Sequence, residues 1–208
     1  MIRFDRVTFG YGLSAPLLRD FSLELPSGRR ICLMAPSGRG KTTALRLLLG
    51  LERPRRGSVT RPDGIRFSTV FQEDRLLPWK TVVENAALFS DKETACRILT
   101  QLGLGDSLDA LPETLSGGMK RRAALGRALA HPFDVLVLDE ALTGLDTASR
   151  AQCLAAINEA VGPRTLLMAS HNADDAAALH AQIIGRQRLR ACQIGVRVAG
   201  IARSTRAH

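Results

Sequence analysis

A chain of 208 residues, of which 45% are hydrophobic, is long enough for one well-packed domain, and its formal charge is +9. No apolar run approaches the roughly 18 residues that cross a bilayer, and the N-terminus lacks the apolar core of a signal peptide, so we expect a soluble, cytoplasmic chain. Arginines account for the excess charge after Asp175, but aromatic residues make up only 4% of the chain and do not alternate with them. No nucleic-acid partner is therefore expected.

The N-terminal part of the sequence predicts strands followed by a helix. Apolar and polar residues alternate at residues 2–9 and 21–25, as is typical of half-buried strands. The apolar run at residues 31–34 predicts a buried strand. A glycine-containing loop follows it and leads into a helical pattern at residues 42–49, which Gly50 ends.

Strands and helices alternate in the rest of the chain. Residues 76–111 have helical patterns with short loops, which indicates a small helical insert. Strand character returns at residues 135–138 and 166–168, each time after a helix-like segment. This alternation predicts a mainly parallel sheet covered by helices, with ligands bound at the carboxyl ends of the strands.

The cysteines are scattered along the chain and form no CxxC pair. Neither a zinc site nor a disulfide framework is therefore indicated, and we expect buried free thiols at Cys32, Cys96, Cys153 and Cys192.

Residues 35–42 read APSGRGKT and lie between a predicted buried strand and a predicted helix, which is the context of a P-loop. Backbone N–H groups from Gly38 to Thr43 can surround phosphates, and the N-terminus of the helix adds to the attraction. Lys41 would reach the β- and γ-phosphates, and the Thr42 hydroxyl would bind Mg²⁺. The candidate nucleotide-binding residues of this loop are Ala35, Pro36, Ser37, Gly38, Arg39, Gly40, Lys41, Thr42 and Thr43.

Two features of this loop leave questions open. Ala35 stands at the usual first glycine, which matters only if this position needs a positive φ. A glycine-rich turn that merely resembles a P-loop is the alternative interpretation of the segment taken alone.

Two further segments carry a family resemblance. Residues 115–122 read LSGGMKRR and resemble the signature motif of ATP-binding-cassette (ABC) ATPases, and residues 135–140 read VLVLDE and resemble a Walker B motif. With the P-loop, they identify residues 1–185 as similar to an ABC ATPase domain. The resemblance implies ATP and Mg²⁺ as cofactors, Asp139 as a Mg²⁺ ligand and Glu140 as the base that polarises the attacking water.

The resemblance also implies a fold. It is an α/β P-loop NTPase with a mainly parallel central sheet, an antiparallel N-terminal β part and a helical subdomain at about residues 73–130, inserted between the Q-loop and the signature motif.

Other family elements occur in the expected order along the chain. By resemblance, Tyr11 would stack on adenine, and Gln72 would contact Mg²⁺ and sense the third phosphate as one of the catalytic residues. Asp146 of the D-loop would belong to the nucleotide site, and His171 would hydrogen-bond the γ-phosphate as a further catalytic residue. For Tyr11 considered alone, ordinary packing is the better interpretation, but the order and spacing of the family elements favour the stacking role.

The signature motif implies a partner subunit. Ser116, Gly117 and Gly118 are expected at a helix N-terminus, which favours anions, yet the chain already has a complete P-loop. In the family the subunits dimerise head to tail, so these residues would close on the nucleotide of a second ABC ATPase subunit, either an identical copy or a paralogue.

Residues 71–82 read FQEDRLLPWKTV and look like the importer ATPases for nitrate, sulfonate, taurine and similar solutes. In those proteins this region faces a transmembrane permease, so the permease would dock between Gln72 and Trp79. The protein would then be peripheral on the inner face of the cell membrane. The alternative is that Trp79 only anchors the helical insert.

The sequence therefore predicts an ATP-hydrolysing motor subunit of an importer, without identifying the solute. Ala141, where the family usually has proline, and Ala35 motivate a second hypothesis, a degenerate cassette that binds nucleotide without hydrolysis. A soluble ABC ATPase outside transport is a third. The resemblance ends near Ile184, and residues 186–208 form a basic tail for which a disordered end and an altered reading frame both remain open.

Overall fold

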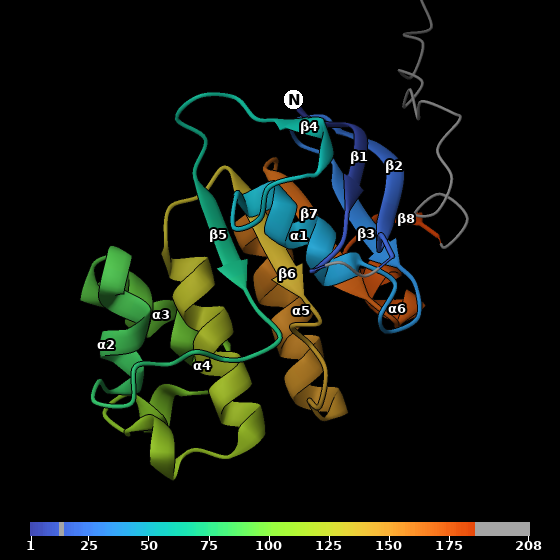
Figure 1. The fold of residues 1–208 in the computed structure, drawn as a ribbon. Helices are drawn as coiled ribbons and strands as arrows, with labels where there is room; N and C mark the ends of the chain where they lie inside the picture. The colour runs from blue at the N-terminus through green and yellow to red at the C-terminus, as the bar shows by residue number, and fades with distance from the viewer. Residues whose placement is uncertain (13–14, 186–208) are drawn as a thin grey trace, which may run out of the picture.

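The computed structural model describes residues 1–12 and 15–185 (Figure 1). The strands are β1 (Ile2–Phe9), β2 (Leu18–Leu25), β3 (Arg30–Met34), β4 (Arg56–Thr60), β5 (Phe67–Val70), β6 (Val135–Asp139), β7 (Thr165–Ser170) and β8 (Gln182–Ile184). The α-helices are α1 (Lys41–Leu49), α2 (Val82–Ala86), α3 (Lys92–Gln101), α4 (Gly117–Ala130), α5 (Thr147–Val161) and α6 (Ala173–Ala178). The predicted basic tail at residues 186–208 lies outside the described residues.

The strands form two sheets. An antiparallel sheet has the order β2-β1-β4, and a parallel sheet has the order β5-β6-β7-β3-β8. The predicted α/β fold, with a parallel sheet and an antiparallel N-terminal part, is therefore confirmed.

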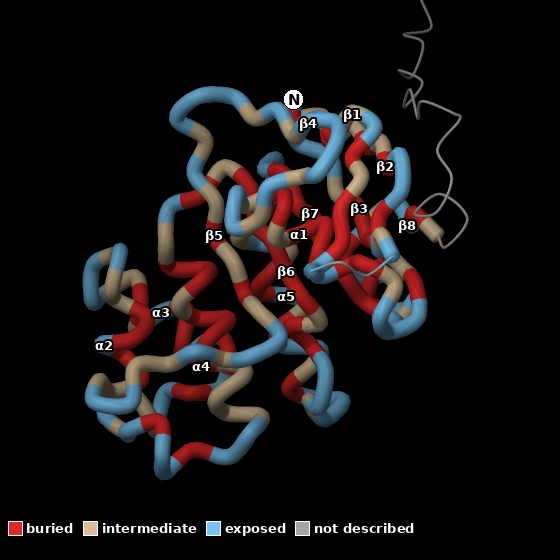
Figure 2. Tube along the Cα trace, in the orientation of Figure 1, coloured by how far each residue is buried: buried red, intermediate tan, exposed pale blue. Residues whose placement is uncertain are grey.

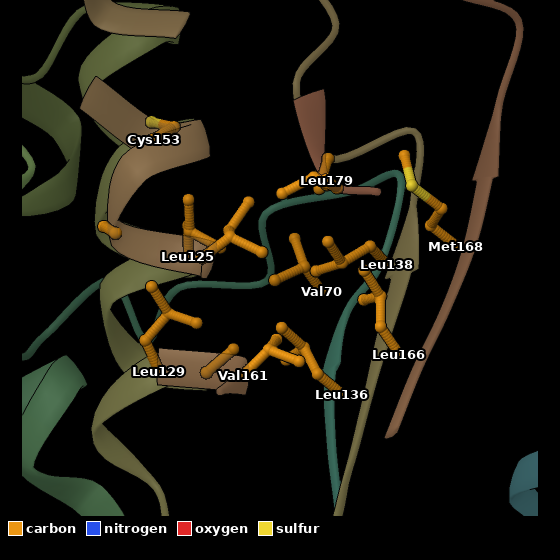
Figure 3. Packing of buried hydrophobic residues seen from close by; sticks show 14 of the residues in the cluster. Val70, Leu125, Leu129, Leu136, Leu138, Cys153, Val161, Leu166, Met168 and Leu179 are labelled. Atoms are coloured by element: carbon orange, nitrogen blue, oxygen red, sulfur yellow. The ribbon is translucent and has the colours of Figure 1, made fainter. Parts of the chain in front are cut away.

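The central strands β6, β7 and β3 of the parallel sheet are buried, which explains why they are largely apolar runs in the sequence, whereas the edge strands β5 and β8 are partly exposed (Figure 2). One face packs against α1 and the antiparallel sheet through Ile31, Leu33, Val135, Val137, Leu167 and Ala169. The other face packs against α4 and α5 through Cys32, Val70, Leu136, Leu138, Leu166 and Met168 (Figure 3). The elements packed on the two faces of the sheet hold the carboxyl ends of β3, β5, β6 and β7 in fixed positions.

The sequence did not predict β4 or β8. Arg56–Thr60 is mostly exposed and has only Val59 partly buried, so it lacks the apolar alternation of a strand. It forms because β1 offers a free edge, with Phe4 opposite Val59. Gln182–Ile184 is a short strand at the edge of the parallel sheet, next to β3.

The chain between β5 and β6 is helical, and its helices have side-chain caps. Thr81 and Glu84 form a capping box at α2, Asp91 caps α3, and Ser116 caps α4. These helices share a separate apolar cluster of Val82, Val83, Ala86, Ala95, Leu99, Leu104, Leu115 and Ala123. In Figure 1 they lie beside the β5 edge of the sheet, whereas α1 lies over the sheet.

Among the described residues, no helix is both long and apolar enough to cross a membrane. The expectation of buried thiols is confirmed for Cys32 and Cys153 but is wrong for Cys96, which is partly exposed on α3. Cys192 lies outside the described residues.

Candidate nucleotide site

The loop between β3 and α1 has the backbone conformation that its glycines allow. Gly38 and Gly40 have φ values of 73° and 88°, in the left-handed region. A Cβ at Gly40 would also lie 2.9 Å from Cδ2 of Leu18, so a side chain there would require Leu18 to shift. Ala35 is buried and does not have a positive φ, so replacing the usual glycine there causes no backbone strain.

This loop borders a pocket of about 230 Å³. Besides residues 37–43 of the loop, the pocket is lined by Leu17, Gln72 and Glu140. The structure therefore brings Gln72, after β5, and Glu140, after β6, to the loop that follows β3. No motif or pattern in the sequence pointed to Leu17.

Lys41 is buried at the first position of α1. Its ammonium group donates hydrogen bonds to the carbonyl oxygens of Ala35, at 2.6 Å, and Pro36, at 3.4 Å. Its Nζ also lies 3.4 Å from Oε1 of Glu140. These contacts compensate for burying the charge and fix the ammonium group at the pocket wall.

Asp139 is the last residue of β6 and is only 2% exposed. Burial raises the pKa of its carboxyl group, while a hydrogen bond with the Thr42 hydroxyl opposes this rise. Its Oδ1 is buried and has no hydrogen-bond partner. A buried carboxylate oxygen without a partner, beside a hydroxyl oxygen, fits a hard cation such as Mg²⁺.

Glu140 lies between two basic side chains. Oε2 of its carboxylate is 3.6 Å from Nδ1 of His171, and Oε1 faces Lys41. The backbone of Glu140 has a φ of 51°, which is unusual for a residue other than glycine, and its N–H donates to the carbonyl oxygen of Ala169. This backbone conformation directs the carboxylate into the pocket.

The loop that carries His171 is braced by a network that the sequence did not predict. Asp175, only 3% exposed, accepts hydrogen bonds from Nε of Arg150 at 2.8 Å and from Oγ of Ser170 at 3.3 Å. The Ser170 hydroxyl in turn accepts from the backbone N–H of Asn172. The only sequence signal was a carboxylate within the otherwise apolar residues 175–179.

The signature residues lie at the N-terminus of α4, outside the P-loop pocket. Ser116 is the N-cap of α4, with Gly117 and Gly118 in its first turn, which confirms the predicted helix N-terminus. Asp146 is the N-cap of α5 and accepts from the N–H of Ser149. None of these residues lines the pocket.

Tyr11 does not line this pocket either. It lies on the exposed loop after β1, 45% exposed, and its ring packs edge-on against Phe9 with the ring centroids 5.0 Å apart. An exposed aromatic face is compatible with a stacked base, which remains a prediction.

A family model described as "ABC transporter" matches residues 18–143. The chain belongs to the ABC transporter family. This ABC protein is 35% identical over 193 residues to the aliphatic sulfonates import ATP-binding protein SsuB 1 of Rhodococcus jostii, an alignment that covers 88% of this chain and 79% of the relative. It is also 35% identical to the thiamine import ATP-binding protein ThiQ of Photorhabdus laumondii, with coverage of 86% and 83%.

The fold agrees with that of solved ABC cassettes. The dimeric post-hydrolysis state of the ATP-binding cassette MJ0796, bound to ADP and Pi, superimposes with a TM-score of 0.79 over 89% of this chain and 94% of that one. At 24% identity this likeness shows the fold alone. Membership of the ABC family makes the chain a nucleotide-binding ATPase.

Proposed function

We propose that this ABC ATPase is the motor subunit of an importer for a small solute of the sulfonate, nitrate or taurine kind. The observation that carries the proposal is the position of the Glu140 carboxylate, which lies between Lys41 and His171 at the P-loop pocket. The importer assignment is supported by relatives at 35% identity whose names describe import ATP-binding proteins.

In the proposed reaction, the backbone of residues 35–43 surrounds the phosphates of ATP, and Lys41 contacts the β- and γ-phosphates. Mg²⁺, when bound, would neutralise phosphate charge, and Thr42, Asp139 and Gln72 would hold it. The unpartnered Oδ1 of Asp139 supports this assignment.

Glu140 accepts a proton from the attacking water as a general base. His171, within 3.6 Å of that carboxylate, donates a hydrogen bond to the γ-phosphate. Tyr11 stacks on the adenine ring.

Two ATPase subunits share each nucleotide in the proposed assembly. Because Ser116, Gly117 and Gly118 do not line the pocket of their own chain, they are free to contact the γ-phosphate bound by a partner subunit, with Asp146 nearby. The partner is a second copy or a paralogue.

The permease docks on the segment between Gln72 and Trp79, which places the motor at the inner face of the membrane. The Trp79 side chain is 71% exposed, so it is not packed into the helical insert. The buried Asn85 amide bonds the backbone of Leu77, Lys80 and Thr81 and holds the turn that presents Trp79. Residues 1–185 form the ATPase domain, within which residues 73–130 are a helical subdomain.

A phosphate-release assay on the purified protein with Mg-ATP tests the proposal, with Glu140→Gln as its matched control. ATP hydrolysis by the wild type, lost in Glu140→Gln, would support the proposed motor function. ATP binding without any hydrolysis would instead support a degenerate cassette. The unstrained backbone at Ala35 gives no support to that alternative.

A further inference from the structure

The signature helix is joined to the Q-loop by one arginine. Arg121, in the second turn of α4, donates from Nη1 to the carbonyl oxygen of Phe71 at 3.0 Å and from Nη2 to that of Gln72 at 2.7 Å. Its Nη1 also lies 3.1 Å from Oδ1 of Asp74. Its side chain is 15% exposed, so these contacts are largely shielded from water.

A second arginine of the same helix binds the next part of the loop. Arg127 donates from Nη1 to the carbonyl oxygen of Arg75 at 2.7 Å and from Nη2 to that of Asp74 at 3.0 Å. Burial lowers the pKa of Arg127, and the charge of Asp74 opposes this effect. Two side chains of α4 thus bind most of the carbonyl groups of residues 71–75.

These contacts connect two parts of the site that are distant in sequence. Gln72 lines the P-loop pocket, and Ser116 caps the helix that carries Arg121. A helix moves as a rigid unit over a few turns, so a shift of Ser116 carries the guanidinium group with it. The carbonyl group of Gln72 is bound directly to that guanidinium group.

We propose that Arg121 is a positioning residue, which fixes Gln72 in the pocket relative to the signature Ser116. The proposal rests on the proposed ATPase site. When the nucleotide bound by a partner subunit contacts Ser116, α4 shifts, and Arg121 passes this shift to Gln72 of the same subunit. A lysine cannot replace the arginine fully, because its ammonium group lacks the rigid planar fork that Arg121 presents to the carbonyl groups of Phe71 and Gln72.

The neighbouring Arg122 provides a matched control. It lies on the same helix and also donates to two carbonyl oxygens, those of Leu102 at 2.9 Å and Gly103 at 3.1 Å. These carbonyl groups follow α3 and are not part of the Q-loop. Loss of either arginine removes similar bonds, but only Arg121→Ala releases Gln72.

The test compares Arg121→Ala, Arg121→Lys and Arg122→Ala in steady-state hydrolysis, in equilibrium binding of Mg-ATP, and in hydrogen exchange of residues 71–75. Arg121→Ala should lower kcat by about 10- to 100-fold, keep the nucleotide Kd within about threefold, and speed exchange in the Q-loop. Arg121→Lys should recover part of kcat. Arg122→Ala should keep kcat and Q-loop exchange close to the wild type.

Equal loss of kcat in the two alanine variants, or an unchanged kcat in Arg121→Ala, would overturn the inference. If Arg121→Ala does not fold, Arg121→Lys provides the comparison, with Arg122→Lys as its control, and a wild-type kcat in Arg121→Lys would overturn the inference. A wild-type protein that hydrolyses no ATP would instead overturn the proposed function, so the two failures are distinguishable.

Discussion

The ammonium group of Lys41 lies 3.4 Å from Oε1 of Glu140, so the proposed phosphate-binding residue and the proposed base form an ion pair. The side chains are only 5% and 18% exposed, which makes the pairing stronger than it would be at the surface. A γ-phosphate that reaches Lys41 competes with the Glu140 carboxylate for the positively charged ammonium group. Binding of ATP is therefore expected to release the carboxylate toward the attacking water.

Replacing Lys41 with alanine should weaken ATP binding by about 10- to 100-fold, because hydrogen bonds from a charged donor contribute about 1.5–3 kcal/mol each. Fluorescence titration with ATP measures the effect, and circular dichroism checks that the variant is folded. A folded variant with wild-type affinity would show that the P-loop assignment is wrong.

Asp139→Asn should abolish the Mg²⁺-dependent gain in ATP affinity and raise the thermal stability of the nucleotide-free protein. Burial raises the pKa of Asp139, so its charge is unfavourable there when no cation is bound. Each kcal/mol added to the free energy of unfolding raises Tm by about 2–4 °C in a domain of this size. Calorimetry with and without Mg-ATP measures both effects, and a variant that still responds to Mg²⁺ would exclude Asp139 as a ligand.

Local patterns predicted much of the fold and of this site. The apolar runs at residues 31–34 and 135–138 predicted buried parallel strands, and the polar residues after them predicted the edge where the pocket lies. The strand β4 could not be predicted, because Val59 is the single core-facing apolar residue of Arg56–Thr60 and gives no alternating pattern; the strand forms by pairing with β1.

Local sequence patterns could not predict the contacts between residues of the site either. The bonds of Arg121 to residues 71 and 72 join segments far apart in the sequence, which only the packing of α4 beside β5 brings together. The burial of Asp175 likewise depends on its contacts with Arg150 and Ser170.

Trp79→Ala should weaken assembly with the permease, since an exposed tryptophan at an interface typically contributes about 2 kcal/mol or more. The side chain is 71% exposed, so the fold should survive its removal. Co-purification of motor and permease measures assembly, with Leu51→Ala as a control at an exposed apolar residue after α1. Normal assembly of Trp79→Ala would place the docking surface elsewhere.

Stability should fall in alkaline solution partly because of Cys153. Burial raises the pKa of its thiol to about 11, from an ordinary value of 9.0. Between these values the unfolded chain has lost the proton that the folded chain keeps, so the free energy of unfolding falls as pH rises, by at most about 1.4 kcal/mol per pH unit. Guanidinium unfolding at pH 8 and pH 10 should show a smaller decrease for Cys153→Ala than for the wild type. Equal decreases would contradict this prediction.

Glu140→Gln should bind Mg-ATP and hydrolyse it about 10²- to 10⁴-fold more slowly, because the amide keeps the shape of the side chain but cannot accept the proton. The trapped nucleotide should then hold two subunits together, with its γ-phosphate contacted by Lys41 and His171 of one chain and by Ser116 and Gly118 of the other.

The most direct test of this shared site is the mass of Glu140→Gln measured by light scattering with Mg-ATP, alone and combined with Ser116→Arg. Ser116 caps α4 and does not line the P-loop pocket of its own chain, so the added substitution should leave nucleotide binding by the monomer intact. The single variant should be a dimer and the double variant a monomer. A double variant that still dimerises would contradict contact of the signature motif with the partner's nucleotide.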